Sequence, residues 1–332
     1  MSGVVALIVN YESGDRLRRC VDAVLSGERP PERVLVVDNG SRDGSIDGLP
    51  STVDVISLPD NPGYGAAIRA GMAASDEAFV LTLNPDVEVE PRALAAAHQA
   101  LESDPGAGSV AMTVVQASDP QRLDATGIGI TSRGGQINWD HGLLLNAAAS
   151  VPKDVLGPLG GAALWRRSAL DAIGGFATHF FLYWEDMDVA LRLNRAGYTC
   201  PSVPESIARH EGSASTGHWS RLNVYYMVRN HWPCLIGGLP RACLMRHAVQ
   251  VALAPLRAAA LYASRGRPGA ALAGLIVGAA LLPATLLRRR HLPKAAGPTD
   301  AAERIEQLMA AADENRMAMK DRAPRLGPKA AP

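Results

Sequence analysis

Along the first third of the chain, short runs of apolar residues alternate with segments in which apolar residues recur at the spacing of a helix. The runs are rich in Val, Ile and Leu and end at turn-forming residues, as buried β-strands do. This alternation predicts an α/β fold in which a doubly wound, mostly parallel sheet is flanked by helices. The expected strands are Val4–Val9, Arg33–Val37, Val53–Leu58, Ala78–Leu83 and Ser109–Val115, and the expected helices are Asp15–Leu25, Tyr64–Ala74 and Pro91–Glu102.

Polar clusters follow three of these strands. They are Asp38-Asn39, Asp60-Asn61 and Asn84-Pro85-Asp86. Each cluster is also good turn chemistry, so one cluster alone would indicate only a loop. The carboxyl ends of parallel strands meet at one edge of a sheet, however, and ligands bind there. The clusters together predict a ligand site at that edge, where the carboxylate of Asp86 suits Mg²⁺ or Mn²⁺.

Beyond Val115 the pattern is less regular. Residues 127–145 are rich in glycine and alternate in polarity, which indicates a hairpin or a mobile loop. Short helices are expected over Ser168–Ile173 and Trp184–Arg195, and Gly197 suits the end of the second helix.

The C-terminal third differs in character. An amphipathic helix is expected over Arg241–Ala263, and Gly269–Leu287 carries no charge. This uncharged run is near the length that spans a membrane, but its Ala, Gly and Pro residues favour helices lying in the interface. An exposed helix is expected over Asp300–Arg316. The chain is thus divided into a catalytic α/β domain (1–215), a cationic, amphipathic, membrane-associated helical section (216–295) and a polar, partly disordered tail (296–332).

Charge is balanced over the whole chain but not along it. The formal net charge is zero, yet no acid lies between Glu211 and Asp300, where arginines are frequent. A cationic, apolar section suits an anionic membrane surface. The cysteines show no CxxC spacing, which is typical of reduced thiols in the cytoplasm. We therefore expect a cytoplasmic protein associated peripherally with the inner face of the plasma membrane, with no nucleic-acid partner.

Three carboxylates open the helix expected over Trp184–Arg195. Glu185, Asp186 and Asp188 follow an aromatic run that suits the wall of a pocket. Acids at a helix N-terminus are stabilised by the helix dipole, so capping alone is one explanation. Three carboxylates exceed that need, and one of them in a partly desolvated site can act as a general base toward a hydroxyl. His210 is a further candidate, because imidazole can bind a metal or contact phosphate.

A series of short motifs follows in a fixed order between residues 4 and 215. They are Ile8-Val9-Asn10-Tyr11, Val36-Val37-Asp38-Asn39-Gly40-Ser41, Asn61-Pro62-Gly63-Tyr64-Gly65, Leu83-Asn84-Pro85-Asp86, Gly160-Gly161-Ala162, Gly174-Gly175-Phe176, Tyr183-Trp184-Glu185-Asp186-Met187-Asp188 and His210-Glu211-Gly212-Ser213. Each motif is weak alone, but the ordered set resembles the inverting family 2 glycosyltransferases with the GT-A fold. Among the branches of this family, the motifs most resemble those of the rhamnosyltransferase-like branch.

The resemblance implies a role for each candidate residue. Asp186 would be the catalytic base, with Glu185 and Asp188 positioning the acceptor and the base. Asp86 and His210 would hold Mg²⁺ or Mn²⁺ and the donor diphosphate. The residues implied in binding the nucleotide-sugar donor are Asn10, Asp38, Asn39, Asn61, Asn84 and Gly161. Asn84 occupies the first position of the family's Asp-x-Asp element, which removes one carboxylate from the metal site.

The implied reaction is the inverting transfer of a sugar from a nucleotide diphosphate to a hydroxyl. The acceptor would be a glycan or a polyprenyl-linked molecule in cell-envelope polysaccharide synthesis, and the branch suggests L-rhamnose from deoxythymidine diphosphate rhamnose. Two alternatives stay open: a sugar nucleotidyltransferase, and a catalytically inactive carbohydrate-binding or scaffold protein on the same fold. A dinucleotide-binding oxidoreductase is disfavoured, since no G-x-G-x-x-G follows the first strand. The oligomeric state is not readable.

Overall fold

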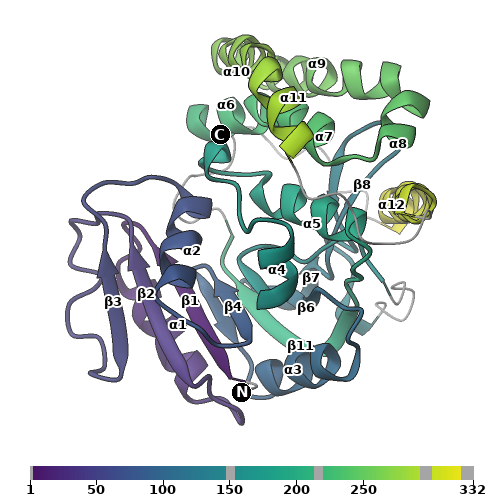
Figure 1. The fold of residues 1–332 in the computed structure, drawn as a ribbon. Helices are drawn as coiled ribbons and strands as arrows, with labels where there is room; N and C mark the ends of the chain where they lie inside the picture. The colour runs from purple at the N-terminus through teal and green to yellow at the C-terminus, as the bar shows by residue number, and fades with distance from the viewer. Residues whose placement is uncertain (1–2, 147–153, 213–219, 292–300, 323–332) are drawn as a thin grey trace.

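The computed structural model describes residues 3–146, 154–212, 220–291 and 301–322 (Figure 1). A mixed β-sheet covered by helices makes up the part drawn in purple to teal. The helices of the C-terminal section gather beyond one end of this sheet. They are α6 (Arg221–Arg229), α7 (His231–Gly238), α8 (Arg241–Arg246), α9 (Ala248–Ser264), α10 (Pro268–Ala280) and α11 (Leu282–His291).

The sheet confirms the α/β fold but is mixed. In hydrogen-bonding order its strands are β3 (Val53–Ser57), β2 (Arg33–Asp38), β1 (Val4–Asn10), β4 (Phe79–Leu83), β10 (Ala162–Arg166), β6 (Ser109–Gln116), β11 (Ser202–His210) and β5 (Val87–Val89), and β7 (Asp119–Ala125) pairs with β6. The strands from β3 to β4 are parallel. β10 runs antiparallel to both β4 and β6, because the chain enters it at the rim where β4 ends.

Alternate residues of β1 face two separate cores. The side chain of Ile8 packs with α1 and α3 on one face, and that of Leu7 packs with α2, α4 and α5 on the other. A parallel strand covered on both faces is apolar along its whole length, which explains its continuous hydrophobic run. The covering helices are α1 (Asp15–Leu25), α2 (Tyr64–Ala73), α3 (Ala93–Ser103), α4 (Arg167–Ala172) and α5 (Glu185–Arg195).

The prediction of one continuous helix over Arg241–Ala263 is wrong. The chain leaves helical geometry at His247, between α8 and α9. The ring of His247 contacts the Glu306 carboxylate at 2.8 Å. The break coincides with this long-range contact, which no local pattern contains.

The uncharged run forms most of α10 and the start of α11. No single helix in the described ranges is long and apolar enough to cross a membrane. Together, α10 and Leu282–Arg290 have the length and composition of a span, but the two helices are bent by 43° relative to each other. Gly274 and Gly278 allow α10 to lie against α6. A Cβ at Gly278 would lie 2.8 Å from the Arg229 carbonyl oxygen, so a larger residue would force the two helices apart.

The tail helix α12 (Ala301–Arg322) is longer than expected and is not solvated on all sides. It packs beside strand β8 (Ile128–Ile130), which pairs with β9 (Gln136–Asn138) as the hairpin expected from the Gly-rich stretch. The buried stripe of α12 consists of Ile305, Leu308, Met309 and Ala312. The prediction of an exposed helix is therefore wrong, because this narrow stripe at helical spacing is hidden in a polar sequence.

Polar contacts also join α12 to the rest of the protein. The Asn315 amide donates to the Asp140 carboxylate at 2.7 Å, and Arg304 pairs with Asp154 at 3.1 Å. Residues 301–322 are thus part of the folded body, whereas residues 296–300 and 323–332 of the expected tail lie outside the described residues.

The buried stripe of α12 gives a stability prediction. Ile305→Ala should lower the free energy of unfolding by about 2–5 kcal/mol, since it opens a cavity in a fully buried position. The midpoint of urea unfolding measures the change. Met317→Ala on the same helix is the control, because Met317 is 58% exposed and its truncation should have little effect. Equal midpoints for the two variants would contradict the packed position of α12.

Candidate active site

The ends of β1 and β2 carry a buried polar network. The Asn10 amide donates to the Asp38 carboxylate at 2.7 Å and to the hydroxyl of Ser45 at 2.9 Å. The Ser41 hydroxyl and backbone N–H also donate to Asp38, at 2.6 Å and 3.0 Å. A carboxylate held by several donors keeps a fixed orientation in the sheet edge. The structure therefore brings the predicted residues Asn10 and Asp38 together and adds Ser45 to them.

Asn39 and Asn61 extend this network toward α2. The Asn39 side-chain amide donates to the Asn61 side-chain oxygen at 3.2 Å, and the same oxygen accepts the Gly63 N–H at 3.0 Å. The Asn39 side-chain oxygen is buried and has no hydrogen-bond partner among the described residues. A buried acceptor without a donor carries a free-energy cost, which an N–H of a nucleotide base would remove.

The Gly160-Gly161 turn contacts both the end of β4 and the start of α5. The Asn84 N–H donates to the Gly161 carbonyl at 2.9 Å, and a Cβ at Gly161 would lie 2.4 Å from the Asn84 amide nitrogen. The Gly160 N–H donates to the Asp186 carboxylate at 3.3 Å. Since Asn84 is two residues from Asp86, these contacts place both predicted acids at one rim of the sheet.

His210 lies between two carboxylates at this rim. Its Nε2 is 3.6 Å from Asp86, and its Nδ1 is 2.7 Å from Asp124 on β7. Burial alone would lower the pKa of His210, but the hydrogen bond to Asp124 and the charge of Asp86 outweigh it and raise the pKa. Asp124 was missed from the sequence, because it lies in a strand that the pattern did not reveal.

Asp86 and His210 suit a cation that is also held by substrate phosphates. The described residues contain no group of three or more His, Cys, Asp or Glu side chains arranged as a complete metal site. Mg²⁺ and Mn²⁺ need only one or two protein carboxylates when a diphosphate and water supply the other oxygens. The donor set of Asp86 and His210 fits this arrangement. His210 must release its proton to become a ligand, so cation binding there would be favoured at higher pH.

Glu185, which is half-buried, and Asp186, which is buried, form an acid pair at the start of α5. Burial raises the pKa of Glu185 to about 8, and the charge of Asp186 adds to this effect. Burial also raises the pKa of Asp186, although the backbone N–H groups of Gly160 and Met187 stabilise its ionised form. One Glu185 carboxylate oxygen is buried without a hydrogen-bond partner among the described residues. The pair is thus able to share one proton near neutral pH.

Asp188, on the same helix, is held by an arginine. Its carboxylate accepts two hydrogen bonds from Arg192, at 2.6 Å and 2.9 Å, and both side chains are buried. Asp188 is two positions from Asp186 but three from Glu185, and residues three apart on a helix are neighbours. Besides burial and the charge of Asp186, the charge of Asp188 accordingly contributes to the raised pKa of Glu185. These contacts show a buried ion pair beside the acid pair, and the role of Asp188 in positioning the acceptor and the base stays a prediction.

The segment before the acid pair has an unusual backbone. Phe181, Tyr183 and Trp184 have φ values of 65°, 63° and 73°, in the left-handed region that side chains other than glycine rarely adopt. Such residues cost about 1–3 kcal/mol each and persist only where the surroundings hold them. The Phe181 carbonyl accepts the Tyr64 N–H at 2.8 Å, which ties the segment to the start of α2.

The junction of α6 and α7 holds the other side of this segment. The buried Asn230 amide donates to the carbonyls of Phe180, Leu182 and Tyr183, each at 2.9 Å. The indole of Trp184 donates to the Met227 carbonyl at 3.0 Å. Asn230 was missed from the sequence, where it stands between Arg229 and His231 without a local signal. The helical section thus positions the acid pair of the α/β domain.

Removing the Asn230 side chain should loosen the left-handed segment. Asn230→Ala leaves the carbonyls of Leu182 and Tyr183 without a donor, whereas the Phe180 carbonyl keeps the Leu182 N–H. This should cost about 1–3 kcal/mol or more, and it should speed amide hydrogen exchange over residues 181–187. Asn223→Ala is the matched control, because Asn223 donates to the hydroxyl of Tyr183 and not to the backbone of the segment. Unchanged exchange in Asn230→Ala, with a normal melting temperature, would contradict the positioning role.

The raised pKa of Glu185 predicts a pH-dependent stability. Between its ordinary pKa of 4.5 and its folded-state pKa of about 8, the unfolded chain ionises at Glu185 while the folded chain keeps the proton. Stability is therefore lost as pH rises through this window. Glu185→Gln should melt higher than the unaltered protein at pH 9, with no gain at pH 4. Glu205→Gln, at an exposed position, should show no such trend, and a gain of equal size at both pH values would contradict the assignment.

Comparison with known sequences agrees with this geometry. The profile of the family described as Glycosyl transferase family 2 matches residues 5–174. An N-acetylglucosaminyl-diphospho-decaprenol L-rhamnosyltransferase of Mycobacterium tuberculosis is 27% identical over 243 residues, which are 65% of this chain and 79% of the relative. The O-antigen biosynthesis protein RfbC of Myxococcus xanthus is 27% identical over 226 residues, which are 64% of this chain and 17% of the relative.

Solved structures share the GT-A-type fold. The mannosyltransferase PcManGT from Pyrobaculum calidifontis, in complex with GDP-Man and Mn²⁺, has a TM-score of 0.55 at 18% identity over 96% of this chain and 83% of its own. GalNAc-T7 with UDP, GalNAc and Mn²⁺ has a TM-score of 0.57 at 13% identity over 71% of this chain and 48% of its own. The profile match, which spans half of the sequence and the ends of β1, β2 and β4, shows that the chain belongs to glycosyltransferase family 2.

Proposed function

We propose that this glycosyltransferase is an inverting, metal-dependent enzyme that moves L-rhamnose from a deoxythymidine diphosphate donor to a lipid-linked glycan. The observation that carries the proposal is the convergence of three groups at one rim of the sheet. A nucleoside-binding network lies at Asp38 and Asn39, a cation-binding pair at Asp86 and His210, and an acid pair at the buried Asp186 and its half-buried neighbour Glu185.

The rim supplies each function that single-displacement sugar transfer needs. Asp38 and the unpartnered oxygen of Asn39 bind the nucleoside by accepting its hydrogen bonds. A divalent cation bound by Asp86 would offset the charge that develops on the leaving diphosphate. Asp186 accepts the proton of the attacking acceptor hydroxyl, because a carboxylate of raised pKa is a stronger base than an exposed one. Attack from the face opposite the diphosphate inverts the anomeric carbon.

Glu185 and Asp186 have different parts in this scheme. Two backbone N–H groups hold the Asp186 carboxylate in one orientation, which suits the group that meets the acceptor hydroxyl. Glu185 has a free buried oxygen and a pKa raised to about 8, so it carries the proton that the pair retains near neutral pH. A protonated Glu185 beside Asp186 keeps the base ionised by removing like-charge repulsion.

The acceptor and the location are proposed from the relatives and from the helical section. The Mycobacterium tuberculosis relative is named for a diphospho-decaprenol acceptor, and the Myxococcus xanthus relative for O-antigen biosynthesis. The helical section is cationic and exposes large apolar side chains on α9, α10 and α11, among them Leu253, Leu272 and Leu286. These features support a cytoplasmic enzyme at the inner face of the plasma membrane that builds cell-envelope polysaccharide.

Two variants separate donor binding from chemistry. Deoxythymidine diphosphate rhamnose with Mn²⁺ should raise the melting temperature, because a ligand that binds only the folded state stabilises it. The shift should shrink with EDTA and in Asp86→Asn. Asp186→Asn should keep the shift and lose transfer by about 10²-fold or more, the usual contribution of a general base. Asp171→Asn, an exposed acid on α4, should behave like the unaltered enzyme.

The alternative functions predict other results in the same assays. A sugar nucleotidyltransferase would release pyrophosphate when mixed with a nucleoside triphosphate and a sugar phosphate. A carbohydrate-binding scaffold would show the donor shift without transfer to any of a panel of acceptors. Near-normal turnover by Asp186→Asn would overturn the assignment of the base and leave donor binding unaffected.

A further inference from the structure

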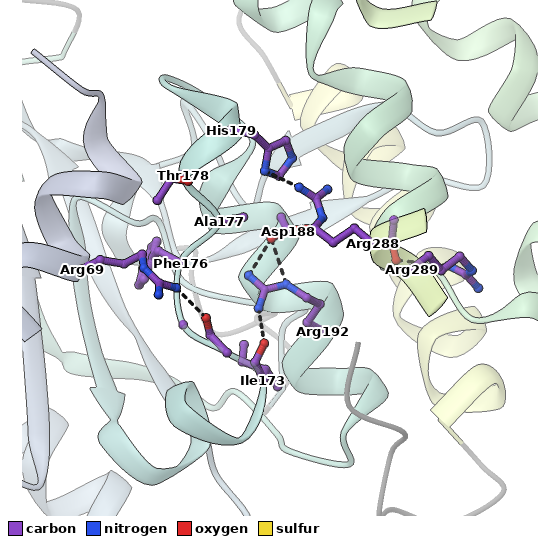
Figure 2. A pocket seen from close by; sticks show the side chains of 13 residues that line it. Arg69, Ile173, Phe176, Ala177, Thr178, His179, Asp188, Arg192, Arg288 and Arg289 are labelled. Atoms are coloured by element: carbon purple, nitrogen blue, oxygen red, sulfur yellow. Dashed lines mark hydrogen bonds and ion pairs between the residues drawn. The ribbon is translucent and has the colours of Figure 1, made fainter. Parts of the chain in front are cut away.

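A cavity lies beside α5, at the positions of Asp188 and Arg192. Its volume is about 480 Å³, and its walls come from α2, the segment after α4, α5, α7 and α11 (Figure 2). Its charged and titratable lining residues are Arg69, His179, Asp188, Arg192, Arg288 and Arg289. We call it the arginine cavity. None of these side chains has a part in the transfer scheme above.

The lining of the arginine cavity is strongly positive. It contains four guanidinium groups and one carboxylate, and that carboxylate, Asp188, is already paired with Arg192. The remaining three arginines hydrogen-bond to neutral groups. Arg69 donates to the Gly174 carbonyl at 2.9 Å, and Arg289 donates to the Ile236 carbonyl at 2.7 Å. Carbonyl oxygens orient a guanidinium but do not neutralise its charge.

Arg288 and His179 face each other in the cavity (Figure 2). Burial, with the charge of Arg288 as the next contribution, lowers the pKa of His179 to about 4. Burial likewise lowers the pKa of Arg288 and of Arg289. The His179 Nε2 is buried without a hydrogen-bond partner among the described residues. The cavity therefore concentrates positive charge in a partly desolvated space, where an anion would find strong attraction.

The helix that supplies Arg288 also presents apolar side chains to solvent. Leu286 and Leu287, directly before Arg288 on α11, are 51% and 57% exposed, and Ile276 on the adjoining α10 is 62% exposed. Cationic groups beside exposed apolar residues match a molecule with an anionic head and an apolar chain. Phosphate suits this head, because guanidinium groups bind its oxygens in pairs.

We propose that the arginine cavity binds a phosphate or diphosphate group, as a site separate from the donor nucleotide site. The group would come from a membrane lipid or lipid-linked molecule docked on α10 and α11, or from a soluble phosphate compound. This site goes beyond the transfer reaction and does not depend on it, so each is tested without the other. Arg288 and Arg69 would contact the phosphate oxygens, and Arg192 would stay with Asp188.

Calorimetric titration of the full chain with inorganic pyrophosphate tests the site directly. EDTA is present throughout, so that no cation supports binding of pyrophosphate at Asp86. Saturable binding is expected, and Arg288→Gln should weaken it by about 10-fold or more, as expected when a hydrogen bond to a charged group is lost. Arg290→Gln is the matched control, because Arg290 is an exposed neighbour on α11 that does not line the cavity. It should bind like the unaltered protein.

A second variant guards against misfolding. If Arg288→Gln fails to melt cooperatively, Arg69→Gln replaces it, since Arg69 is exposed on α2 and its guanidinium reaches the cavity from the other side. No saturable binding to the unaltered protein, or equal loss in the Arg288 and Arg290 variants, would overturn the proposal. The second outcome would show that general surface charge, and not the cavity, attracts the anion.

Vesicle sedimentation distinguishes the two sources. Phosphatidylcholine vesicles are compared with vesicles that contain phosphatidylglycerol, for the unaltered protein and both α11 variants. Binding to the anionic vesicles that Arg288→Gln weakens, Arg290→Gln preserves and pyrophosphate displaces would assign the site to a lipid headgroup. Pyrophosphate binding that depends on Arg288, together with vesicle binding that does not, would assign it to a soluble phosphate compound.

Discussion

The acid pair depends on a stretch of left-handed backbone that the chain cannot maintain by itself. Phe181, Tyr183 and Trp184 together store several kcal/mol of conformational strain, at about 1–3 kcal/mol each. Hydrogen bonds from the first residue of α2 and from Asn230 hold them in place. This left-handed backbone turns the chain so that α5 starts with Asp186 buried and Glu185 half-buried at the rim of the sheet. The helices after residue 220 are therefore required for the site, although no predicted site residue lies on them.

Most of the rim was predictable because its signals are local. A buried strand followed by a polar turn appears directly in the sequence, as at Asn10, Asp38 and Asn84. The parallel arrangement of β1, β2 and β4 then brings these ends together without further information. The hairpin formed by β8 and β9 was predictable for the same reason, since its glycines and alternating residues are contiguous.

The features of the fold and the site that the sequence did not predict depend on contacts between segments far apart in the chain. Asp124 meets His210 across 86 residues, and Asn230 meets Tyr183 across 47, so neither role has a local signature. The antiparallel direction of β10 and the burial of α12 are likewise set by tertiary contacts. Asp188 shows what a local motif leaves out. Its motif implied a place in the reaction but did not reveal the ion pair that its carboxylate forms with Arg192.

The position of β10 has a consequence for how the protein is made. This strand lies between β4 and β6, yet both of those strands leave the ribosome well before residues 162–166 do. Until then β4 and β6 expose unpaired edges, which are prone to associate with other chains. β11, which also pairs with β6, comes later still. Completion of the sheet must therefore wait for distant pairings, which makes slow folding and a need for protection of the nascent chain the expected behaviour.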